Sequence, residues 1–103
     1  MTDIIRGTEL KFNLNIEPIS DVSMSFFNFN VVAYCLGTPQ RVKVLKSDCT
    51  EIDADNFTVP LDTAALGLGQ LILDVYAFIP DQDFIDDYRT EICRIETDVI
   101  IIS

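Results

Sequence analysis

Apolar and polar residues alternate with a period of two over most of this chain, which is the pattern of β-strands with one buried face. Residues 10–17 show it first, with Leu10, Phe12 and Leu14 separated by polar side chains. A second series runs through residues 25–36. The longest is residues 70–79, where every odd position from Leu71 to Ile79 is apolar. The dominant structure is therefore predicted to be β-sheet, with little helix.

Seven strands are predicted, over residues 10–17, 25–36, 41–46, 49–52, 57–59, 70–79 and 91–102. Their spacing of about ten residues, with turn residues between them, favours one small antiparallel β-sandwich of immunoglobulin-like type, with six or seven strands, over residues 1–103. Pro60 is expected to end its strand because it lacks an N–H group. One helical turn is expected near residues 62–66, with Asp62 as its N-cap and Gly67 as the glycine beyond its end.

Uninterrupted apolar alternation predicts the core. Its expected members are Leu10, Phe12, Leu14, Phe27, Phe29, Val31, Leu71, Leu73, Val75, Cys93 and Ile95. Strands 70–79 and 91–102 should lie side by side, as neighbours in sequence usually do. Five apolar residues of the opposite parity, namely Ile72, Tyr76, Phe78, Ile100 and Ile102, then fall on one outer face of the sheet. Tyr76, Phe78, Ile100 and Ile102 are expected to contact another protein there. The alternative is that this face is the inside of a second sheet layer, or is covered by the N-terminal segment Ile4–Ile5.

Charge and residue content narrow the function classes. The 103 residues include 17 acidic and 7 basic side chains and no histidine, which gives a net charge of −10. Such a chain repels nucleic acid and anionic membranes, so neither is expected as a partner. Catalysis that depends on histidine is excluded, and no enzyme activity and no cofactor are expected.

The three cysteines and the start of the chain bear on where the protein is made. The start has no basic and apolar leader, which favours synthesis in a cytoplasm or packing into a particle assembled there. The cysteines are expected to be reduced, with Cys35 and Cys93 buried.

An acidic loop after Pro80 is the one candidate for metal chemistry. Its weak calcium candidates are Asp81, Asp83, Asp86 and Asp87, because calcium prefers clustered oxygen ligands. The spacing misses the helix–loop–helix calcium pattern. A solvated loop in which Arg89 pairs with a carboxylate is therefore the favoured interpretation, and Phe84 and Ile85 are expected to fold back onto the sandwich.

Three segments carry a resemblance to a known family. They are residues 59–71 (VPLDTAALGLGQL), residues 79–91 (IPDQDFIDDYRTE) and residues 97–101 (TDVII). They resemble short proteins encoded by phages and prophages of gut Bacteroidetes, including crAss-like phages. Those proteins are similar to the immunoglobulin-like N-terminal domain of phage upper-baseplate proteins. Their acidic loop usually has Pro-Asp-Gly where this chain has Ile85, Asp86 and Asp87, so this chain lacks the proline and the glycine of that turn.

The resemblance implies a virion structural protein of the tail-fibre or baseplate adaptor type, assembled in the host bacterial cytoplasm. Other virion proteins and copies of the chain itself are then the expected partners, and no catalytic residue is implied. Two alternatives stay open: a calcium- or glycan-dependent recognition module, and a small acidic inhibitor protein.

Overall fold

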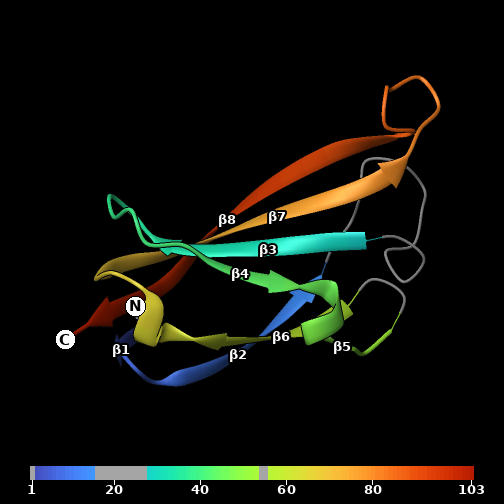
Figure 1. Ribbon diagram of the computed structural model, residues 1–103. Coiled ribbons are helices and arrows are strands. Elements are labelled where there is room, and N and C mark those ends of the chain that lie inside the picture. The colour runs from blue at the N-terminus through green and yellow to red at the C-terminus, as the bar shows by residue number, and fades with distance from the viewer. Residues whose placement is uncertain (1, 16–27, 54–55) are drawn as a thin grey trace.

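The computed structural model describes residues 2–15, 28–53 and 56–103, and this part of the chain forms eight strands in two sheets (Figure 1). The strands are β1 (Thr2–Ile5), β2 (Glu9–Asn15), β3 (Asn28–Cys35), β4 (Val42–Leu45), β5 (Thr50–Glu51), β6 (Asn56–Asp62), β7 (Gly69–Pro80) and β8 (Tyr88–Ile102). Two 3₁₀ turns, η2 (Lys46–Asp48) and η3 (Thr63–Ala65), connect them. Within these ranges, no helix has the length and apolar character that a membrane crossing requires.

The two sheets have the strand orders β1-β8-β7-β3-β4 and β2-β6-β5. All described pairs are antiparallel except β1 with β8, which is parallel. The arrangement of β8-β7-β3 against β2-β6-β5 is the strand order of immunoglobulin-like sandwiches. The predicted all-β sandwich is therefore confirmed, together with the expected pairing of β7 and β8.

Local sequence rules failed at strand β1, which was not predicted, and at Pro60. Strand β1 is four residues long and pairs with Val99–Ile102 at the far end of the chain, so no local alternation reveals it. Pro60 lies inside β6, opposite Lys11, and does not end that strand. Strand β5 reaches only Thr58 on the other side of β6. The missing N–H of Pro60 therefore falls beyond the pairing with β5, where a proline is tolerated.

The core lies between the sheets and confirms most of the predicted residues. Those fully buried are Leu14, Phe29, Val31, Leu71, Leu73 and Val75, while Leu10, Phe12 and Ile95 pack against them half-buried. Phe27 lies outside the described residues. Phe29 and Phe57 join the two sheets with an edge-to-face contact, their ring centroids 4.8 Å apart.

Cys93 is a wrong core prediction, because its side chain is exposed. Strand β8 is flanked at Cys93 by Val75 of β7, whereas β1 pairs with β8 only at Val99–Ile102. In the described part of the chain, Cys93 thus has a neighbouring strand on one side only. All three cysteines are free thiols, and Cys35 is buried as predicted.

The turn after β6 closes one end of the sandwich. Asp62 caps η3 as predicted, since its side chain accepts a hydrogen bond from the Ala64 N–H. Gly67 does not have the left-handed backbone expected of a helix-ending glycine. A Cβ at Gly67 would instead lie 2.7 Å from Thr38 Cγ2, so the close approach of that side chain explains the glycine.

Candidate interaction surfaces

The four predicted contact residues lie on the outer face of the five-stranded sheet, at opposite ends of it. Antiparallel pairing sets Tyr76 opposite Ile92 and Phe78 opposite Thr90, whereas Ile100 is opposite Gln70. Tyr76 and Gln70 are six positions apart on β7, or about 20 Å at the rise of an extended strand. Ile102 lies farther still, beside Ile5 of β1. The structure therefore does not bring the four residues into one patch.

A polar cluster separates the two ends, in which the exposed side chains of Arg41 and Arg94 contact the buried Tyr34 and Asp74. The Asp74 side chain is 8% exposed, and its Oδ1 and Oδ2 accept hydrogen bonds from Arg94 Nε at 2.9 Å and Nη2 at 3.2 Å. The hydrogen bond with Asp74 is the main cause that raises the pKa of Arg94. Arg41 stacks on the buried Tyr34, with its guanidinium carbon 4.0 Å from the ring centroid. The neighbouring Ile72 is also fully buried. The middle of this face is thus closed.

The end of the sheet around Tyr76 and Phe78 is a hairpin arm, defined here as residues 76–92, in which Ala77 and Ile79 are buried core residues. Figure 1 shows β7 and β8 running out together, away from β2 and β6, to the loop that joins them. Phe78 packs edge-to-face on Tyr88, with ring centroids 5.6 Å apart. Arg89 Nη1 lies 2.9 Å from Asp81 Oδ2 and ties the loop to β8. The predicted ion pair between Arg89 and a loop carboxylate is confirmed.

The loop at the end of the arm is a tight, hydrogen-bonded turn. The Asp81 N–H donates to the Asp87 carbonyl at 2.9 Å, and the Asp87 N–H donates to the Phe84 carbonyl at 3.0 Å. Asp87 has φ 61°, a left-handed conformation that aspartate adopts more easily than most residues. Asp87 stands where the resembled family has glycine. The tight turn therefore forms without that glycine.

Phe84 and Ile85 do not fold back onto the sandwich, contrary to the prediction. Their exposed fractions are 51% and 102%, so Ile85 is fully in solvent. The turn hydrogen bonds place both side chains beyond the last pair of the hairpin, Pro80 with Tyr88. Asp83, Asp86 and Asp87 flank them in the sequence and are exposed too.

The four calcium candidates are not arranged as a metal site. Both carboxylate oxygens of Asp81 are already engaged, Oδ1 by the Asp83 N–H at 3.0 Å and Oδ2 by Arg89. The backbone hydrogen bond from Asp83, followed by that from Arg89, lowers the pKa of Asp81. Among the described residues, no group of three or more acidic or cysteine side chains is placed to hold a metal ion.

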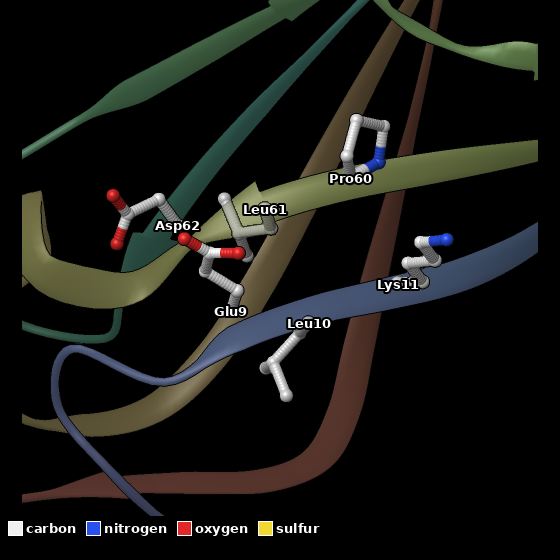
Figure 2. A pocket seen from close by; sticks show the side chains of 6 residues that line it. All are labelled: Glu9, Leu10, Lys11, Pro60, Leu61 and Asp62. Carbon is white, nitrogen blue, oxygen red and sulfur yellow. The ribbon is translucent and has the colours of Figure 1, made fainter.

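A shallow groove at the end of the smaller sheet was not foreseen from the sequence. Its volume is about 420 Å³, and it is lined by Glu9, Leu10, Lys11, Pro60, Leu61 and Asp62. Glu9 and Asp62 are directly opposite each other in the β2–β6 ladder, and Figure 2 shows their carboxylates on the same side of the strand pair. Facing carboxylates repel each other. One oxygen of Asp62 accepts the hydrogen bond that caps η3. The two carboxylates make the groove an acidic feature of the surface.

The comparisons with known proteins add no relative. No protein-family model, curated protein or solved structure matches this chain.

Proposed function

We propose that this chain is a structural subunit of a phage virion, of the tail-fibre or baseplate adaptor type, that acts through protein–protein contacts and has no enzymatic role. The sequence resemblance supports the virion setting. The observation that carries the contact role is the apolar tip of the hairpin arm, Phe84 and Ile85, held in solvent by an ordered turn.

The construction of the arm favours recognition of a partner. Full burial of an exposed Phe or Ile side chain contributes roughly 1.5–3 kcal/mol. A partner's apolar pocket would recover this for Ile85 and about half of it for Phe84, which is 51% exposed. The turn hydrogen bonds and the Arg89–Asp81 ion pair fix the loop before any partner arrives. Less conformational entropy is then lost on binding. In immunoglobulin-like folds, the loop between these two strands is also a common recognition loop, which is support by analogy of fold.

The chemistry of the tip defines the surface that it fits. Phe84 and Ile85 require an apolar pocket, because aromatic and large aliphatic anchors dominate binding energy when fully buried. The exposed carboxylates of Asp83, Asp86 and Asp87, which flank these two residues in the sequence, favour a basic rim around that pocket. The expected partner is therefore another virion protein that carries an apolar pocket ringed by lysine or arginine.

The test is assembly into particles. Particles purified from cultures that produce the phage should contain the unchanged chain, detected by mass spectrometry. A Phe84→Ser/Ile85→Ser variant should keep the circular dichroism spectrum and thermal midpoint of the unchanged chain, because both residues are exposed, and should be lost from particles. Leu36→Ser, at a 63%-exposed residue outside the arm, is the matched control and should still assemble. Absence of the unchanged chain from particles, or normal assembly of the tip variant, would overturn the proposal.

A further inference from the structure

The outer face of the larger sheet combines apolar side chains with positive charge. Lys43 of β4 is opposite Val32 of β3, and both point away from the core because their neighbours Val31 and Val44 are buried. The next row toward the arm has one residue on each of β4, β3, β7 and β8, namely Leu45, Asn30, Tyr76 and Ile92. The basic face is defined here as Val32, Arg41, Lys43, Leu45, Tyr76 and Ile92.

Arg41 and Lys43 give the basic face its charge. The guanidinium group of Arg41 lies on the ring of Tyr34, and its Nη1 donates to the carbonyl groups of Thr38 and Gln40, which are neutral. In the described part of the chain, no carboxylate forms an ion pair with Arg41 or Lys43. Both side chains are exposed, so both positive charges face solvent.

The other charges on this side of the sheet are balanced or distant. Asp74 neutralises Arg94 through its two hydrogen bonds, so the inference makes no use of Arg94. Glu96 lies on β8, which is three strand spacings, or about 14 Å, from β4. In a chain of net charge −10, the basic face therefore attracts an acidic partner.

The tip of the hairpin arm has the complementary chemistry. Phe84 and Ile85 are exposed apolar side chains, and Asp83, Asp86 and Asp87 add three exposed negative charges beside them in the sequence. Within the described ranges, no basic side chain forms an ion pair with these three carboxylates. The chain thus carries both an acidic apolar tip and a basic apolar face.

A chain cannot place its tip on its own basic face. Strands β7 and β8 pair without interruption from Tyr76 out to Pro80, which is four residues, or about 13 Å, beyond the basic face. Figure 1 shows these two strands extending past β4 to the loop that joins them. Contact between the two surfaces therefore requires a second copy.

We propose that the hairpin tip of one copy of this chain docks on the basic face of a second copy. The inference rests on the proposed role of the tip and names the surface that receives it. Phe84 and Ile85 pack on the apolar side chains of Val32, Leu45 and Tyr76, and the aspartates of the tip meet Arg41 and Lys43. The two strands of a hairpin are about 4.8 Å apart, so the tip fits on a face that is four strands wide.

The contact joins two different surfaces, so each docked copy still has a free tip or a free basic face. Such heterologous contacts repeat from copy to copy and form a ring if the rotation closes, or a filament if it does not. Association is therefore expected to continue beyond the dimer. A two-fold contact between identical surfaces would stop at the dimer.

The first test uses the isolated chain. Analytical ultracentrifugation over about 1–100 µM should show reversible association beyond the dimer, with affinity in the micromolar range. Lys43→Glu should weaken this association by more than about tenfold, because it sets like charges against each other. Lys11→Glu makes the same change at an exposed residue of β2, gives the same net charge and should leave the association unchanged.

Mixing two variants tests whether the contact joins tip to face. Phe84→Ser/Ile85→Ser lacks the tip and keeps the basic face, whereas Lys43→Glu lacks the face and keeps the tip. Each variant alone should be monomeric at concentrations where the unchanged chain associates. The mixture should form a one-to-one heterodimer and nothing larger, because only one functional tip and one functional face remain.

Three results would overturn the inference: a chain that is monomeric at all these concentrations, variants that stay monomeric on mixing although the unchanged chain associates, or equal weakening by Lys43→Glu and Lys11→Glu. A monomeric chain whose tip variant is lost from particles would leave the proposed function standing. An associating chain that passes the mixing test but is absent from particles would overturn the proposed function and leave the inference standing.

Discussion

The buried hydroxyl of Thr63 gives the sharpest stability prediction. Thr63 is fully buried, and its Oγ1 lies 2.8 Å from both the Gly7 nitrogen and the Thr8 carbonyl oxygen. It accepts a hydrogen bond from the Gly7 N–H and donates one to the Thr8 carbonyl. These two bonds tie η3 to the turn between β1 and β2, which are more than fifty residues earlier in the chain. Thr63→Val removes both and keeps the volume of the side chain.

The expected loss follows from those two bonds. A hydrogen bond inside a protein contributes about 0.5–1.5 kcal/mol net, so the pair is worth about 2 kcal/mol of unfolding free energy. That is a large share of the 5–15 kcal/mol typical of a domain. For a chain of this size, it corresponds to a fall of roughly 10 °C in the thermal midpoint. Urea unfolding followed by far-ultraviolet circular dichroism would measure it, with no change expected in the slope.

Two matched variants identify the cause. Thr63→Ser keeps the hydroxyl and loses one methyl group, so it should be destabilised by only about 1 kcal/mol. Thr58→Val makes the same substitution in β6 at an exposed hydrogen bond of 3.3 Å to Asn13, and should change stability by less than about 0.5 kcal/mol. The reasoning is refuted if Thr63→Val is as stable as Thr58→Val.

Three further predictions concern the thiols and the hairpin loop. Alkylation of the native protein, followed by mass spectrometry, should modify exposed Cys93 quickly and leave buried Cys35 unmodified. After denaturation without reductant, all three cysteines should be alkylated. Early labelling of Cys35 would contradict its burial in the core. Asp87→Gly should raise the unfolding free energy by about 0.5–1 kcal/mol in denaturant titrations, because glycine relieves the left-handed backbone; a decrease would contradict that strain. The lowered pKa of Asp81 means that its carboxylate stabilises the fold above the unfolded pKa near 3.9, and that this contribution is lost as pH falls from there through the lower pKa of the folded state. The deficit of Asp81→Asn in unfolding free energy should therefore be constant near neutrality and shrink below about pH 4.

The sequence by itself determined seven of the eight described strands and most of the core. The alternation along a strand is a local property, because odd and even positions lie on opposite faces of the sheet and one of these faces is buried. That is why Leu71, Leu73 and Val75 were predicted correctly, and why the Asp62 cap and its turn were too. The ion pair of Arg89 with a loop carboxylate was also predictable, since both charges lie in one short acidic segment.

The tertiary structure alone decided which parts of each strand are covered. Cys93 and Leu73 have the same kind of alternating neighbours, yet one is exposed and the other buried. The difference is the position of β8 at the margin of its sheet, which depends on where β1 pairs nearly a hundred residues away in sequence. Antiparallel register likewise separated Tyr76 from Ile100, because pairing reverses the order of residues along the partner strand. The face on which each residue of a strand lies can be predicted from the sequence, whereas the burial of that residue depends on which distant strands pair.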